Sequence, residues 1–130
     1  MKVYFISAFM LAFAVSTSAF AMGSAPVQPP VTAVILPSGV QEIHVTAKQF
    51  EFSPNLIQVK KGIPVRIVLT SMDVTHGFAL DAFNVNATIT REAPTTVEFT
   101  PDRTGTFDFH CSVFCGLGHA GMSGKVIVTD

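Results

Sequence analysis

The sequence lacks the patterns of several large protein classes. After the first 21 residues, no segment carries the 3.6-residue hydrophobic period over three turns that an amphipathic helix requires. The same part has seven Lys and Arg against nine Asp and Glu, so it offers no positive field for nucleic acid or anionic lipid. Tryptophan is absent, and cysteine occurs only twice. These absences exclude a helical bundle, argue against a nucleic-acid partner and allow at most one internal disulfide.

The N-terminus has the pattern of an export signal. Lys2 precedes a mostly apolar run over residues 3–15, and Ala19-Phe20-Ala21 matches the small-x-small preference of signal peptidase. The unbroken apolar run is shorter than the ~20 residues that a membrane-spanning helix needs. We therefore predict a cleaved signal peptide over residues 1–21 and a periplasmic protein. The alternative is an anchor on the outer face of the inner membrane, formed by residues 3–22.

The next segment, residues 22–40, contains four prolines among mainly small and apolar residues. This composition favours an extended, poorly packed segment over a helix, and we predict a flexible linker. The remaining residues, 41–130, are enough for one small domain with its own core but too few for two. The mature chain is therefore expected to be a single module.

From residue 41 onward, the hydrophobic pattern changes to period two. Ile43, Val45 and Ala47 alternate with polar residues, as half-buried strands do. Similar short runs, separated by turn residues, cover residues 50–52, 56–60, 65–70, 78–80, 84–89, 96–100, 107–111 and 125–129. Short strands at such regular spacing are typical of an antiparallel sandwich or a Greek-key barrel. The fold class is therefore predicted to be all-β.

One loop concentrates the residues that bind soft metals. Both cysteines, a histidine and a methionine lie between Cys111 and Met122, with the spacing C-x3-C-x3-H-x2-M. Thiolate, imidazole and thioether select copper, whereas magnesium or calcium would require oxygen ligands. A Cys111–Cys115 disulfide is the alternative, but it would close only a four-residue step and leave His119 and Met122 unexplained. We therefore predict a copper loop.

A mononuclear copper site with two imidazoles, one thiolate and an axial sulfur needs a second histidine from elsewhere. His76 is the best candidate, because it lies in a break between two predicted strands and Gly77 permits close backbone approach. Asp73 either orients this loop by accepting hydrogen bonds or is an ordinary turn residue. His44 alternates outward on its strand, and His110 points to the face opposite Cys111, so both are expected at the surface.

Two motifs together resemble one family. Asp73-Val74-Thr75-His76-Gly77-Phe78, followed by Cys111-x3-Cys115-Gly-Leu-Gly-His119-x2-Met122, is similar to the cupredoxins. Within that family, the motifs look like the binuclear copper A domains of cytochrome c oxidase subunit II and nitrous oxide reductase. The similarity covers residues 41–130. It implies a cupredoxin-like Greek-key β-sandwich or barrel that holds two copper ions.

The resemblance also implies a role for each ligand. The implied metal ligands are His76, Cys111, Val113, Cys115, His119 and Met122. The two thiolates would bridge the coppers, each imidazole would bind one copper, and the thioether and the valine carbonyl would be weak ligands to different coppers. The family often places an exposed tryptophan where electrons enter. Because this chain has none, Phe114 and Phe78 are the nearest aromatic candidates.

These assignments predict an electron-transfer protein, either a free carrier or the subunit through which electrons enter a cytochrome c oxidase-type complex. Its partner would be a redox protein such as a c-type cytochrome or a terminal reductase or oxidase. All six ligands are used by copper, so no open position is expected for a small-molecule substrate, and we expect no catalysis by this chain alone. The alternatives are a periplasmic copper-binding or delivery protein and a mononuclear blue-copper carrier in which Cys111 is a spare thiol.

Overall fold

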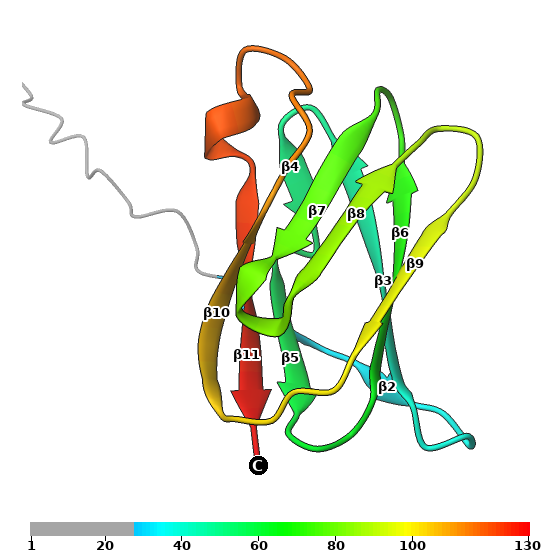
Figure 1. Cartoon of the computed structure of the whole chain (residues 1–130), viewed down its shortest axis with the longest axis vertical. Helices are drawn as coiled ribbons and strands as arrows, with labels where there is room; N and C mark the ends of the chain where they lie inside the picture. Colours follow the sequence, from blue (N-terminus) through cyan, green and yellow to red (C-terminus); the bar gives the residue numbers. More distant parts are fainter. Residues whose placement is uncertain (1–27) are drawn as a thin grey trace, which may run out of the picture.

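The protein is a sandwich of two β-sheets (Figure 1). The computed structural model describes residues 28–130, so the predicted signal peptide lies outside the described residues. One sheet has the order β1-β5-β11-β10-β7-β8, and the other has the order β2-β3-β6-β9, with β4 paired to β3. The strands are β1 (Val31–Thr32), β2 (Val34–Ile35), β3 (Gln41–Lys48), β4 (Glu51–Ser53), β5 (Leu56–Lys60), β6 (Val65–Ser71), β7 (His76–Leu80), β8 (Val85–Ile89), β9 (Thr95–Phe99), β10 (Gly105–His110) and β11 (Ser123–Thr129). Two single-turn 3-10 helices, η1 (Asp81–Phe83) and η2 (His119–Gly121), follow β7 and precede β11.

The period-two pattern explains the core. On β3, Ile43, Val45 and Ala47 are buried between the sheets, while alternate residues face outward. Phe78 of β7 and Phe109 of β10 meet in the centre with ring centroids 4.9 Å apart, and Phe52 packs edge-on against both. The predicted all-β sandwich is confirmed.

Three strand pairs in the sandwich are parallel rather than antiparallel. β3 pairs with β6 in parallel, as do β5 with β11 and β1 with β5. The reason lies in the connections, because the chain leaves β3, forms β5 in the opposite sheet and then returns to place β6 beside β3. Such a crossover between sheets makes neighbouring strands run in the same direction.

The structure describes residues 28–40 of the predicted linker, and two short strands lie there. Within that segment, β1 pairs with β5 and β2 pairs with β3, and Ala33 between them is buried in the core. A proline-rich chain is extended, and its free backbone groups can hydrogen-bond to the edge of a sheet. Residues 31–35 therefore belong to the folded domain.

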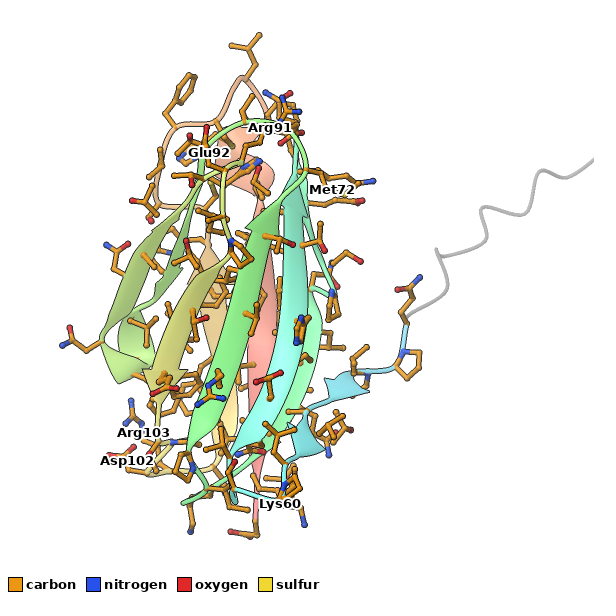
Figure 2. All side chains as sticks on the ribbon, turned by 90° about the vertical axis from the view of Figure 1, so that its right-hand side faces the viewer. Lys60, Met72, Arg91, Glu92, Asp102 and Arg103 are labelled. Carbon is orange, nitrogen blue, oxygen red and sulfur yellow. The ribbon has the colours of Figure 1, made fainter. Side chains whose placement is uncertain are left out.

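Besides the β8–β9 loop, three connections meet at one end of the sandwich, seen at the top in Figure 1. They are the β3–β4 turn, the β6–β7 loop and the β10–β11 loop. Figure 2 shows Met72, Arg91 and Glu92 at this end and Lys60, Asp102 and Arg103 at the opposite end. None of the helices in residues 28–130 is long and apolar enough to cross a membrane.

Candidate metal site

The most concentrated group of metal-binding side chains lies where these three connections meet. His76, Cys111 and Cys115 are buried, and their ligand atoms all lie within 4.8 Å of one another. The two Sγ atoms are 3.6 Å apart, and the Sγ of Cys111 is 4.0 Å from Nδ1 of His76. His76 is the first residue of β7, whereas Cys111 directly follows β10. The antiparallel pairing of β7 with β10 therefore brings these two residues together.

The remaining predicted ligands complete the group from within the β10–β11 loop. The Sγ of Cys115 is 3.7 Å from Nδ1 of His119 and 3.8 Å from Sδ of Met122, which is fully buried. On the other side, the carbonyl oxygen of Val113 is 3.1 Å from the Sγ of Cys111. Helix η2 turns the chain between His119 and Met122, so that both side chains face the thiols. The structure thus brings all six predicted residues together.

Asp73 orients the buried histidine. Its Oδ1 is 2.7 Å from Nε2 of His76, which leaves Nδ1 facing the thiols. The carboxylate also accepts hydrogen bonds from the backbone N–H groups of Gln49 and Val74. Partial burial acts to raise the pKa of Asp73, but these hydrogen bonds and the nearby imidazole outweigh it and lower that pKa. Asp73 is therefore ionised at neutral pH and holds the ring in one orientation.

The Cys115 thiol retains its proton until a metal displaces it. Burial, together with the hydrogen bond between the two cysteine side chains, raises the pKa of Cys115 to about 11. Neither cysteine is in a disulfide. Because a metal binds the thiolate, loading of this site releases protons.

The donor set fits copper. Two thiols, two imidazole nitrogens, a thioether and a carbonyl converge in a largely buried space. Sulfur and imidazole are the donors that copper prefers, and no carboxylate oxygen lies in the group itself. The carboxylate of Asp73 is hydrogen-bonded to the far nitrogen of His76.

Close packing between the loops requires a glycine beside His76. A Cβ at Gly77 would overlap the Ser112 hydroxyl and would lie 2.6 Å from the backbone nitrogen of Val113. The backbone N–H of Gly77 instead points to the Sγ of Cys111, at 3.4 Å. The close approach expected from the sequence is therefore a direct contact between the two ligand loops.

Sequence reasoning missed the contribution of the β3–β4 turn. Phe50 was expected in a strand, but it lies in this turn and is 40% exposed. A Cβ at Gly116 or Gly118 would lie within 2.9 Å of its ring atoms. Gln49 donates a 2.6 Å hydrogen bond from Nε2 to the carbonyl of Cys115. The paired glycines of the copper loop were the one available signal, since they leave room for an aromatic ring.

The two aromatic candidates for electron entry differ in position. Phe78 is fully buried in the core, so it is wrong as an exposed contact. Phe114 is 73% exposed, and its ring centroid lies 5.6 Å from that of His119. Leu117 beside it is completely exposed. Together with Phe50, these residues form an apolar surface over the ligand loop.

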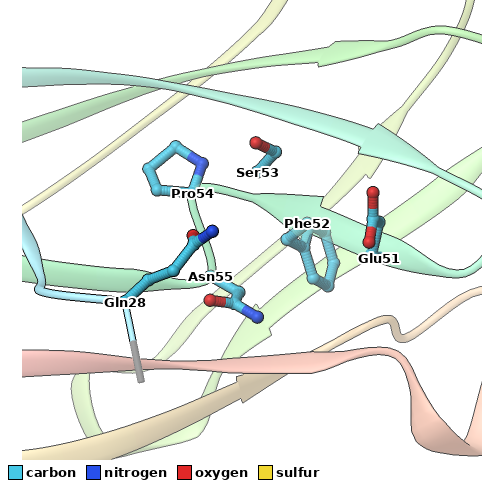
Figure 3. A pocket seen from close by; sticks show the side chains of 6 residues that line it. All are labelled: Gln28, Glu51, Phe52, Ser53, Pro54 and Asn55. Carbon is cyan, nitrogen blue, oxygen red and sulfur yellow. The ribbon is translucent and has the colours of Figure 1, made fainter. Parts of the chain in front are cut away.

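The remaining histidines and Met72 are exposed and are not part of the ligand group. His44 and His110 are exposed, as expected. Met72 is 66% exposed in the β6–β7 loop. A shallow pocket at the β4–β5 turn, shown in Figure 3, contains none of the predicted ligands. It is lined by Gln28, Glu51, Phe52, Ser53, Pro54 and Asn55.

Comparison with known proteins agrees with this geometry. The family model of the cupredoxin-like domain matches residues 5–128 of the sequence. The chain belongs to the cupredoxin-like family. The resemblance found in the two motifs is therefore confirmed, together with the fold that it implied.

The relatives of this cupredoxin-like chain include oxidase and reductase proteins. Cytochrome c oxidase subunit 2 of Thermus thermophilus is 35% identical over 88 residues, which cover 68% of this chain and 65% of that protein. Nitrous-oxide reductase of Cupriavidus necator is 33% identical over 90 residues, which cover 66% of this chain and 14% of that protein. A chain of a heme-copper terminal oxidase dimer superimposes with a TM-score of 0.65 at 26% identity, over 82% of this chain and 76% of that chain. The chain thus spans less than two thirds of the length of either sequence relative.

Proposed function

We propose that this chain is a copper-binding electron-transfer domain whose centre holds two copper ions bridged by the thiolates of Cys111 and Cys115. One observation carries the proposal. The predicted ligands divide into two groups, with His76 and the Val113 carbonyl beside one sulfur and His119 and Met122 beside the other. The two sulfurs lie 3.6 Å apart between the groups. A site for one copper would not need a separate group of ligands beside each sulfur.

In this proposal, His76 and the Val113 carbonyl hold one copper, while His119 and Met122 hold the other. The bound pair supplies one-electron redox chemistry. The protein contributes a dry, stiff environment, since the two cysteines, His76 and Met122 are buried and the ligand loops pack on the ends of sheet strands. If the ligands keep their positions in both oxidation states, little structural rearrangement accompanies the change of charge, and the barrier to electron transfer is low.

The partner is proposed to be a redox protein, such as a c-type cytochrome or a terminal reductase or oxidase. The names of the relatives support this class of partner. The exposed apolar surface of Phe114 and Leu117 lies next to His119 and would provide the contact. Export to the periplasm, by cleavage after residue 21, is part of the same proposal and rests on the N-terminal sequence pattern.

Copper counting tests the proposal. Purified protein is loaded with copper, and its copper content and electron paramagnetic resonance spectrum are measured for wild type and Cys111→Ser. We expect two coppers per chain in wild type, with hyperfine structure from two nuclei that share one unpaired electron. Cys111→Ser is expected to bind one copper and to lose the shared signal, because it removes a bridge.

The same measurement separates the alternatives. Cys115, His119, Met122 and His76 form a complete mononuclear set. If wild type saturates at one copper and Cys111→Ser has the same spectrum, the binuclear proposal fails and a mononuclear carrier replaces it. A wild type that transfers its copper to an acceptor protein within seconds would instead identify a delivery protein.

A further inference from the structure

We propose that Gln49 is a positioning residue that fixes the separation between the two halves of the metal site. The inference rests on the ligand set of the proposed function. Gln49 lies in the β3–β4 turn, which supplies no ligand but contacts both ligand-bearing loops. Its backbone and its side chain each make one of these contacts.

The first contact reaches the loop of His76. The backbone N–H of Gln49 donates a 2.7 Å hydrogen bond to Oδ2 of Asp73. The other oxygen of that carboxylate bonds to Nε2 of His76, also at 2.7 Å. The orientation of the buried imidazole is therefore tied to the β3–β4 turn through one carboxylate.

The second contact reaches the copper loop. The side-chain amide of Gln49 donates a 2.6 Å hydrogen bond to the carbonyl oxygen of Cys115, a residue 66 positions away in the sequence. Within the described structure, the other hydrogen bonds made by residues 113–121 stay inside the loop from Cys111 to Met122. Gln49 is thus the polar link between the middle of this loop and the rest of the sandwich.

Together, these bonds form a path from His76 through Asp73 and Gln49 to Cys115 that avoids the sulfur atoms. It connects the ligand group around Cys111 with the group around Cys115. The ring of Phe50, the next residue, packs closely against Gly116 and Gly118 of the same loop. Without the Gln49 amide, the Cys115 carbonyl loses its donor and the loop is held there by packing alone.

Two substitutions test the role of the side-chain N–H donor of Gln49. Gln49→Met keeps the length and the backbone N–H but has no side-chain donor, whereas Gln49→Glu has nearly the same shape and places a carboxylate against the carbonyl. Gln28→Met is the matched control, because Gln28 is exposed and lines the pocket at the β4–β5 turn. Each copper-loaded protein is reduced, and copper release to a Cu(I) chelator is timed. The oxidised spectrum and the melting temperature of the copper-free protein are also recorded.

We expect Gln49→Met to release copper about tenfold faster than wild type, as loss of a supporting hydrogen bond at a metal site does, and Gln49→Glu to be faster still. The hyperfine pattern should change in both variants and stay unchanged in Gln28→Met. Release rates within twofold of wild type in both variants would overturn the proposal. A lower melting temperature of the copper-free protein with an unaltered spectrum would also overturn it, since Gln49 would then act on stability alone.

The result is independent of the copper count. If wild type binds one copper, the binuclear proposal fails, yet the ratio of release rates still tests whether Gln49 positions the ligands. If neither variant folds, the role of Gln49 lies in folding and the positioning proposal is wrong.

Discussion

The two histidines of the proposed metal site have very different surroundings. His76 is fully buried at the start of β7, and its Nε2 is held by Asp73. His119 is only half-buried in the single turn of η2, and its ring lies beside the exposed Phe114. Both side chains are imidazoles, so the difference in their burial and in their neighbours comes from the fold alone. We therefore distinguish a rigid inner half of the site, around His76, from an outer half, around His119, that is open to a partner.

Removing each imidazole should give the largest contrast. We expect His76→Ala to lower the free energy of unfolding of the copper-free protein by about 3 kcal/mol, because it leaves a buried cavity and removes one hydrogen-bond partner of Asp73. His119→Ala should cost about 1 kcal/mol or less, since the site is partly open to solvent. Urea unfolding of both variants measures the difference. Equal losses would contradict the division into inner and outer halves.

The inner half also depends on close contact between the loops. Gly77→Ala is expected to destabilise the fold by about 2 kcal/mol and to disturb copper binding, because the new methyl group would meet the backbone of Val113. Gly121→Ala is the control, since a Cβ at that position would have nothing within 4 Å of it. Thermal unfolding and copper titration of the pair check this. A Gly77→Ala protein that matches the control would show that the loops can separate without cost.

Loss of the Asp73 carboxylate, which is hydrogen-bonded to His76, should reduce copper affinity more than it reduces the stability of the fold. Asp73→Asn is expected to weaken copper binding by about 10- to 100-fold, because the charge that holds the imidazole is lost. Asp102→Asn, at the opposite end of the molecule, is the control. Competition titration with a chelator of known affinity measures both. Unchanged affinity in Asp73→Asn would leave His76 positioned by packing alone.

The outer half should matter for the partner. Phe114→Ala is expected to slow electron transfer with a redox partner several-fold, while copper content stays the same, since the ring is exposed beside His119. The rate should depend only modestly on salt, because residues 112–124 carry no charged side chain. Stopped-flow kinetics at low and physiological salt check both points. A steep fall in rate with salt would point to charged groups outside this surface.

The smallest effect is expected far from both halves, on the outer face of β3. The hydrogen bond from His44, opposed by slight burial and aided by Arg66, lowers the pKa of Glu42 below its ordinary value of 4.5. A lowered folded-state pKa stabilises the protein above the unfolded value, and this contribution is lost as pH falls through the folded value. Glu42→Gln should therefore lower the melting temperature slightly at pH 7 and not at pH 3. A difference that grows at pH 3 would contradict this sign.

Much of the fold could be predicted because its patterns are local. The alternation of Ile43, Val45 and Ala47 marks a strand with one buried face, and the structure has this face in the core. The parallel pairing of β3 with β6 was not predictable in this way. Alternation determines which face of a strand is buried, but it contains nothing about which strand lies beside it.

The candidate site, like the fold, has features that local sequence determines and features that depend on tertiary packing. The spacing of Cys111, Cys115, His119 and Met122 confines these side chains to one loop, so the sequence by itself determined that soft ligands would gather there. Only the tertiary structure decided the burial of His76 against Asp73 and the contacts of Gln49 with both loops. These contacts join residues from separate elements, and their formation depends on how the two sheets stack. Spacing along a chain limits distance only within a loop, whereas packing sets the distances between loops.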